Sequence, residues 1–110
     1  MKKFILIYNA PAEAMAQMST ATPEQKEAGM ARWMAWKAKN EGAVVDFGAP
    51  LMPGQVSGNG SEWSATTTEV SGYSIVQGEN AEAIQAILVD HPHLDWHPEA
   101  SIAVHEAIAM

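Results

Sequence analysis

The chain of 110 residues has six Lys and Arg against thirteen Asp and Glu, a formal net charge of −7 and a pI near 4.9. With no cluster of basic residues, this charge excludes nucleic acid and an anionic membrane as main partners. The absence of cysteine excludes disulfides, a thiolate nucleophile and a thiolate metal ligand, and it fits a cytoplasmic protein. A hydrophobic content of 47% with 17% charged residues predicts one globular domain over residues 1–110.

Residues 2–9, KKFILIYN, are expected to form the first strand. Phe4, Leu6 and Tyr8 alternate with Ile5 and Ile7, so both faces of this strand are apolar and both need a covering layer. The start of the chain resembles a secretory signal, but its apolar run is shorter than the ~7–15 residues that such a signal needs. No stretch approaches the ~20 apolar residues of a membrane span.

A loop is expected next, followed by a helix that begins at TPEQ, residues 22–25. This run supplies an N-cap threonine, a proline in the first turn and a capping-box glutamine. The helix is expected to continue to about Asn40 and to stop before Gly42. Helical spacing predicts a buried stripe, widened by Trp36, that consists of Met30, Trp33, Met34 and Ala38.

A second strand is expected within GAVVDFGAPL, residues 42–51, and it carries Asp46 in its middle. Aspartate is depleted in strand interiors, so Asp46 lies either at an exposed position or in a pocket that needs its charge. In the second case it would pair with an imidazole and take part in proton transfer. Residues 54–71 are rich in Gly, Ser and Thr, and Asn59-Gly60 is a tight-turn signal, so this segment is expected to be a loop or a weak hairpin. Trp63 within it would cover a pocket mouth or a subunit boundary.

The third strand is expected at residues 72–77, and Asn80 is expected to cap a second helix. Ile84, Ile87 and Leu88 form the apolar stripe of this helix, and His91 follows on the same stripe. The proline at position 92 ends the helix, because a residue that precedes proline is disfavoured in the helical region. SIAVHEAI, residues 101–108, is the expected last strand.

The predicted order is strand, helix, strand, strand, helix, strand. It is typical of a ferredoxin-like βαββαβ domain of the α+β class, with two helices on one face of an antiparallel sheet. The other apolar face needs a second layer, which predicts a homodimer that packs sheet on sheet. The alternative is a monomer whose segment 54–71 folds back over the sheet.

Four segments resemble the YCII-related family, which is also known for its DGPF subgroup. They are KKFILIYNAP, GAVVDFGAPL, GYSIVQGENAEA, and HPHL followed by ASIAVHE. In their order and spacing they cover most of the chain except residues 54–71. The resemblance implies a ferredoxin-like fold that pairs into a dimeric α+β barrel.

In better-understood members of that family, the pocket combines a histidine on the first helix with an aspartate just before a proline at the end of the second helix. In this chain Trp33 and Trp36 occupy the region of that histidine, and His91 precedes the proline. Together with Asp90 and His93, His91 forms the acid–imidazole cluster that stands in the place of the family's pair.

All four histidines lie within residues 90–106, DHPHLDWHPEASIAVHE. His91 and His93 flank a proline and so share no helical face, and the chain has neither cysteine nor an H-E-x-x-H motif, so no metal and no other cofactor are expected. Each histidine also has a structural interpretation, as a packed or solvated side chain. His91 and His93 are the favoured catalytic residues, because they lie where a helix ends beside the sheet, with Asp46 or Asp90 as the acid partner.

Two functions follow from this pattern. The first is a lyase, isomerase or hydrolase that acts on a small aromatic or carbonyl compound by general acid–base catalysis. The second is a ligand-binding or interaction module without catalysis. Acyl and phosphoryl transfer are disfavoured, because the chain lacks G-x-S-x-G, a phosphate-binding glycine loop and a cysteine nucleophile.

Overall fold

The computed structural model describes residues 1–60, 62–66 and 68–110. The elements run in the order β1 (Lys2–Asn9), α1 (Ala12–Ser19), α2 (Pro23–Lys39), β2 (Val44–Pro50), β3 (Gln55–Val56), β4 (Ser64–Ala65), β5 (Val70–Gly78), α3 (Ala81–Leu88), the 3-10 helix η1 (Pro92–Asp95) and β6 (Ser101–Glu106). The four long strands and the two helices α2 and α3 have the predicted ferredoxin-like order. The α+β prediction is therefore confirmed.

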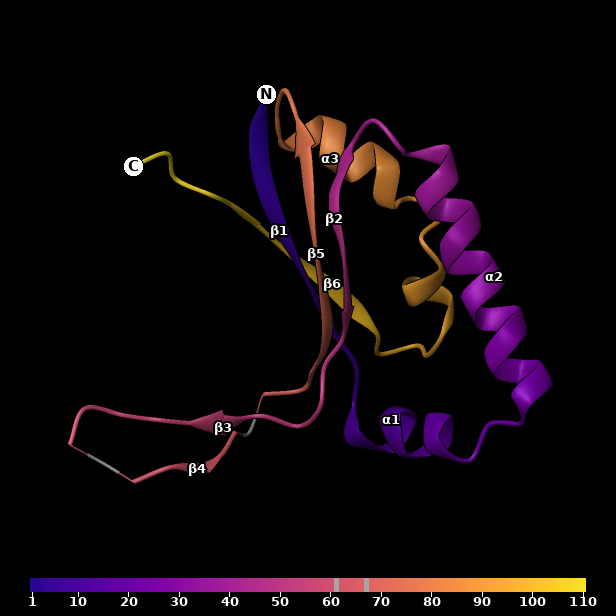
Figure 1. The fold of residues 1–110 in the computed structure, drawn as a ribbon, viewed down its shortest axis with the longest axis vertical. Coiled ribbons are helices and arrows are strands. Elements are labelled where there is room, and N and C mark those ends of the chain that lie inside the picture. The colour runs from indigo at the N-terminus through magenta and orange to yellow at the C-terminus, as the bar shows by residue number, and fades with distance from the viewer. Residues whose placement is uncertain (61, 67) are drawn as a thin grey trace.

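The main sheet has the strand order β2-β5-β1-β6, and its neighbouring strands are antiparallel. Helices α2 and α3 and the turn η1 lie on one side of this sheet, which we call the covered face (Figure 1). The described residues place no helix on the opposite side, which we call the open face. The strands β3 and β4 form a short hairpin that extends away from the sheet. Of the loop and the weak hairpin expected for residues 54–71, the weak hairpin is therefore confirmed.

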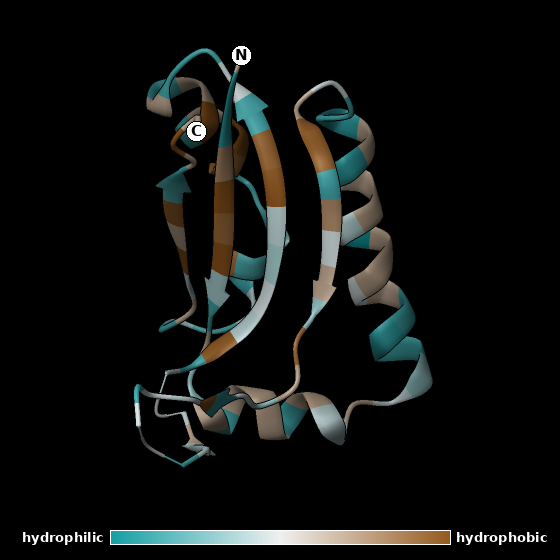
Figure 2. Cartoon of the chain, turned by 60° about the vertical axis from the view of Figure 1, so that its left-hand side comes forward, coloured by the Kyte–Doolittle hydropathy of each residue, from teal (hydrophilic) through white to brown (hydrophobic). Residues whose placement is uncertain are grey.

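The alternation along β1 distributes its side chains between the two faces. Phe4, Leu6 and Tyr8 are buried on the covered face, whereas Ile5 on the open face is 37% exposed. Hydrophobic residues run along both central strands, β1 and β5 (Figure 2). The covered face is therefore the core of the chain, and the open face is an apolar surface.

Helix α2 begins with the predicted capping box, in which Thr22 and Gln25 bond each other's backbone N–H groups. Its buried face differs from the predicted stripe, because Met30 is 54% and Met34 46% exposed. Trp36 instead fills the interface with α3, and its indole N–H donates to the carbonyl of Ile87 at 2.8 Å. The bulkier indoles of Trp33 and Trp36 determine which side of the helix packs, and the predicted burial of Ala38 is likewise wrong.

Residues 12–19 form the helix α1, where a loop was expected. No side chain caps its first turn, and Pro11 stands at the N-cap position, so the usual start signal is missing. The carboxylate of Glu69 supplies the missing acceptor from a distant part of the chain, since it binds the N–H of Ala12 at 3.0 Å. Within α1 the side chain of Ala14 is buried.

Strand β2 is irregular, and its register against β5 shifts on both sides of Asp46. Gly48 adopts a φ of +79°, and a Cβ at this position would lie 1.8 Å from the carbonyl oxygen of Tyr73. Such bulges redirect side chains. Here the shifts place Asp46 opposite Ile75, on the open face.

Candidate functional site

The segment between α3 and β6 carries the buried histidines. Helix α3 ends at Leu88, three residues before His91, so the prediction that His91 continues its apolar stripe is wrong. Pro92 instead begins η1, and His91 is its N-cap residue: the Nδ1 atom of His91 accepts the backbone N–H of His93 at 3.0 Å. The proline thus turns the chain so that both imidazoles point into the protein, where their exposures are 0% and 3%.

The ring of His91 has a fixed tautomer. Because Nδ1 accepts a hydrogen bond, the proton of the neutral ring must be on Nε2, which lies 3.3 Å from the hydroxyl of Tyr8. That hydroxyl donates to Ser74 Oγ at 2.8 Å, and Ser74 donates to the carbonyl of Phe47 at 2.6 Å. All the bonds run in one direction, from His91 through Tyr8 and Ser74 to the backbone.

The burial of this relay keeps it uncharged. Burial lowers the pKa of His91 to about 4; the neighbouring His93 lowers it further, and the carboxylate of Asp90 opposes the shift. Burial also raises the pKa of the Tyr8 hydroxyl to about 12, although the bond to Ser74 opposes that change. At neutral pH both groups are therefore neutral hydrogen-bonding groups, and His91 has no unshared nitrogen to serve as a base.

His93 has the opposite arrangement. Its Nε2 atom lies 2.9 Å from the carbonyl oxygen of Asn9 and 3.1 Å from that of Ser101, so it must carry the proton and donate to both. The lone pair of the neutral ring is then on Nδ1, which has no hydrogen-bond partner among the described residues. No fully buried side-chain nitrogen or oxygen of these residues lacks a partner, so this atom keeps a small accessible area in a side chain that is 3% exposed.

The electrostatics of His93 suit a base. Burial lowers its pKa, and the carbonyls of Asn9 and Ser101 partly oppose this shift. The ring is therefore unprotonated at neutral pH and can accept a proton at Nδ1. The two carbonyls fix its orientation, as a second hydrogen bond commonly does for a catalytic or ligating histidine.

Aromatic rings surround both imidazoles. The ring of His91 lies 4.6 Å from Trp33 and 4.4 Å from Trp36, and that of His93 lies 5.1 Å from Tyr8 and 5.6 Å from Trp96. These contacts come from β1, α2 and the end of η1. They give the site rigid, apolar walls.

The predicted acid partners lie elsewhere. Asp46 is exposed and binds the N–H of Gly48 at 2.9 Å, and Asp90 binds Lys39 at 2.7 Å, an interaction that lowers the pKa of Asp90. Neither carboxylate is hydrogen-bonded to His91 or His93, so the predicted acid–imidazole bond is not formed in this structure. Instead, Tyr8 lies at hydrogen-bond distance from His91, and two backbone carbonyls accept from His93.

The other two histidines are separate from this site. Nε2 of His97 lies 3.3 Å from a carboxylate oxygen of Glu13, and His105 is exposed on β6. Among the described residues, no three His, Asp or Glu side chains are grouped so as to hold a metal ion. None of the helices in this part of the chain has the length and apolar character needed to cross a bilayer.

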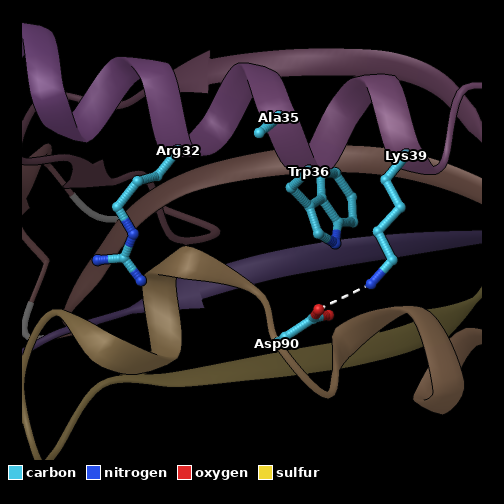
Figure 3. Close-up of a pocket in the computed structure, with 5 residues that line it drawn as sticks. All are labelled: Arg32, Ala35, Trp36, Lys39 and Asp90. Atoms are coloured by element: carbon cyan, nitrogen blue, oxygen red, sulfur yellow. Dashed lines mark hydrogen bonds and ion pairs between the residues drawn. The ribbon is translucent and has the colours of Figure 1, made fainter.

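Two hollows lie near the covered face. One, of about 220 Å³, lies between α2 and the end of α3 (Figure 3), and it is lined by Arg32, Ala35, Trp36, Lys39 and Asp90. The other, of about 490 Å³, lies between α3 and β6, and Phe4, Ile84, Leu88, Ile102 and Val104 form its apolar floor. The first adjoins His91 through Trp36 and Asp90, and neither of these two hollows is lined by an imidazole.

Tyr8 and Ser74 are site residues that the sequence analysis missed. Tyr8 alternates with Phe4 and Leu6, and Ser74 precedes Val76 by two residues, so strand periodicity alone places both on the covered face. A buried serine on a central strand needs an acceptor. That requirement was the available signal for the relay.

Comparison with known proteins identifies the fold. No protein-family model matches the chain, and no curated protein matches its sequence. Among solved structures, 5-chloro-2-hydroxyhydroquinone dehydrochlorinase from Burkholderia phenoliruptrix AC1100, in complex with 2,5-dihydroxybenzoquinone, is similar with a TM-score of 0.53. The similarity covers 96% of this chain and 91% of that one at 12% sequence identity. That protein is named as an enzyme, and the present chain shares its fold.

Proposed function

We propose that this protein is an enzyme that removes a proton from a small aromatic or carbonyl compound, with His93 as the general base. The observation that carries this proposal is the fixed tautomer of His93, whose Nε2 donates to two backbone carbonyls while Nδ1 keeps its lone pair. Orientation of a neutral imidazole in this way is what general base catalysis requires. Trp33 and Trp96, which are partly exposed, supply flat apolar surface for a planar substrate.

In the proposed reaction, Nδ1 of His93 is the proton acceptor. Nδ1 of His93 takes a proton from an acidic C–H or O–H of the substrate and becomes imidazolium. The electron pair released on the substrate moves to a carbonyl oxygen, as in an isomerisation, or expels a leaving group such as chloride, as in an elimination. The imidazolium then returns the proton to the substrate or to water, which restores the base.

The substitution His93→Gln tests the role of the base. The glutamine amide can still donate to the carbonyls of Asn9 and Ser101, but it has no basic nitrogen. With halogenated hydroxyhydroquinones and enolisable cyclic ketones as probes, we expect chloride release or solvent deuterium exchange by the wild type and a loss of at least about 100-fold in His93→Gln. His97→Gln is the matched control and should keep the wild-type rate.

The second candidate function is a ligand-binding module without catalysis. The almost complete burial of both imidazoles favours it, because a buried, hydrogen-bonded histidine can serve packing alone. The same probes separate the two functions. If a probe stabilises the wild type and His93→Gln equally against heat and neither protein turns it over, the protein is a binding module and the enzyme proposal is wrong.

We also propose that the chain belongs to the YCII-related family and forms a homodimer through its open face. The order of its motifs supports the family. Ile5, Ile7, Tyr73 and Ile75 support the homodimer, because they place apolar side chains at the centre of a face that no described element covers. Light scattering at micromolar concentration should give the mass of two chains, and the mass of one chain would contradict the homodimer.

A further inference from the structure

The open face carries Asp46 and His105 at its opposite edges, and Lys3 lies on the same face at one end of β1. The register aligns one row of four residues across the sheet, in the order Asp46 on β2, Ile75 on β5, Ile5 on β1 and His105 on β6. The next row consists of Ala49, Tyr73, Ile7 and Ala103. Both rows are thus apolar and bulky in the middle, while their ends are small or polar.

The carboxylate of Asp46 is only partly satisfied within the chain. Oδ1 accepts the N–H of Gly48, and Oδ2 has no hydrogen bond among the described residues. A carboxylate covered by an apolar surface would lose its hydration without compensation. A partner that packs on the open face must therefore bring a cation or a hydrogen-bond donor to this position.

A second copy of the chain can do so in one of its two simplest face-to-face arrangements. A two-fold axis that runs parallel to the strands, between β1 and β5, places β2 over the partner's β6 and each row over itself. Ile75 then lies over the partner's Ile5, and Asp46 lies over the partner's His105. A two-fold axis that runs across the strands between the two rows places β2 over the partner's β2, where Asp46 meets the partner's Ala49.

The sizes of the side chains fit both arrangements, so the partner of Asp46 decides between them, and only the first arrangement gives Asp46 a hydrogen-bonding partner. This arrangement stacks Ala49 over the partner's Ala103 at the edges, whereas Tyr73 lies over the partner's Ile7 in the middle. Two curved sheets packed in this way approach at their edges and leave space for large side chains between their centres. This is the shape of a closed barrel rather than of two flat layers.

On the basis of the homodimer proposed above, we propose that two copies pack with their strands related by an axis parallel to β1 and β5, and that Asp46 of each copy binds the partner's His105. The pair occurs twice in the dimer. It fixes the register of the two sheets, which the apolar rows alone leave open to a shift. Asp46 and His105 are therefore residues of the interface rather than of the proton-transfer site.

A charge exchange tests the pair. Asp46→Lys places a cation over the partner's His105, and His105→Glu places a second acid over the partner's Asp46, so each single variant should raise the dimer dissociation constant at least tenfold in sedimentation equilibrium. The double variant Asp46→Lys/His105→Glu recreates an ion pair and should return the constant to within about threefold of the wild type. Lys3→Glu, on the same face, is the control. Adding His105→Glu to it should not restore the dissociation constant.

The absence of cysteine permits a second measurement that does not depend on affinity. In the double variant Asp46→Cys/His105→Cys, a short bis-maleimide should link two chains, whereas Asp46→Cys alone should give no linked dimer, because the two copies of position 46 lie at opposite edges. Efficient linking of Asp46→Cys alone would indicate the axis across the strands. That result, or an unrescued double variant in a protein that remains dimeric, would overturn the pairing and leave the homodimer standing. A monomeric wild type would overturn both.

Discussion

The two faces of the main sheet are built from alternate residues of the same strands, yet their side chains have different roles. On the covered face, Phe4, Leu6 and Tyr8 are buried beneath α2, α3 and η1, and Tyr8 joins the apolar core to the imidazole relay. On the open face, Ile5 and its neighbours remain partly exposed. The difference teaches that one strand can supply both the core of a subunit and the surface by which we propose that subunits meet.

The largest expected effect compares Leu6 with Ile5. Leu6→Ala should lower the free energy of unfolding by about 2–5 kcal/mol, because it leaves a cavity in the closed core. Ile5→Ala should cost less, about 1 kcal/mol, in a chain kept monomeric by dilution, because its side chain is partly exposed there and no closed cavity is left. Urea unfolding of both variants measures the difference, and equal losses would show that the open face is covered within one chain.

The next effect concerns the hydroxyl of Tyr8. Tyr8→Phe should lower the free energy of unfolding by about 1–3 kcal/mol, because it leaves Nε2 of His91 and the hydroxyl of Ser74 without their buried partner. Tyr73→Phe on the open face is the matched control and should be nearly neutral. Thermal unfolding measures both, and a neutral Tyr8→Phe would mean that the relay contributes nothing to stability.

The covered face should also make stability depend on pH. The pKa of His91 is about 4 in the folded chain, below its ordinary value of 6.5, and burial likewise lowers the pKa of His93. The unfolded chain therefore binds more protons below pH 6.5, and stability is lost as pH falls from 6.5 toward 4, at up to about 1.4 kcal/mol per pH unit for His91, with a further loss in the same direction from His93. His91→Gln should flatten this slope in urea unfolding, and an unchanged slope would contradict the burial of a neutral imidazole at this position.

The smallest effect concerns the start of α2, which lies beyond the core. Thr22→Ala removes the side-chain acceptor for the N–H of Gln25 and should lower the free energy of unfolding by about 1 kcal/mol. The loss should be independent of pH and of dimerisation, because the capping box touches neither face of the sheet. Denaturant unfolding at two protein concentrations checks both conditions.

Most of the fold followed from periodicity and capping. Thr22 and Asn80 marked the starts of α2 and α3, because an N-cap side chain acts within its own turn and is visible in the local sequence. Helix α1 was missed, because its anchor is Glu69, a residue distant in sequence. The buried side of α2 was assigned wrongly, because spacing alone does not show that two indoles will displace two methionines from the interface.

The site was predictable in part. The segment after α3 drew attention to His91 and His93, whose catalytic role stays a prediction. The nitrogen of His93 that remains free is decided by backbone atoms of β1 and β6. Such backbone acceptors leave no trace in side-chain patterns. Asp46 and Asp90 were predicted as acid partners because of their charge. In the structure Asp46 binds the N–H of Gly48, and Asp90 binds Lys39.

Gly48 has a consequence for how this sequence can evolve. Its left-handed backbone and the contact of 1.8 Å that a Cβ would make with Tyr73 exclude every other residue without a rearrangement of β2. The bulge at this glycine also sets which of its neighbours faces the partner that we propose. Selection should therefore keep glycine at this position in diverged sequences of this kind, even where the aspartate two positions earlier has been replaced. An alignment of distant homologues would then be anchored at this strand by a residue that has no side chain.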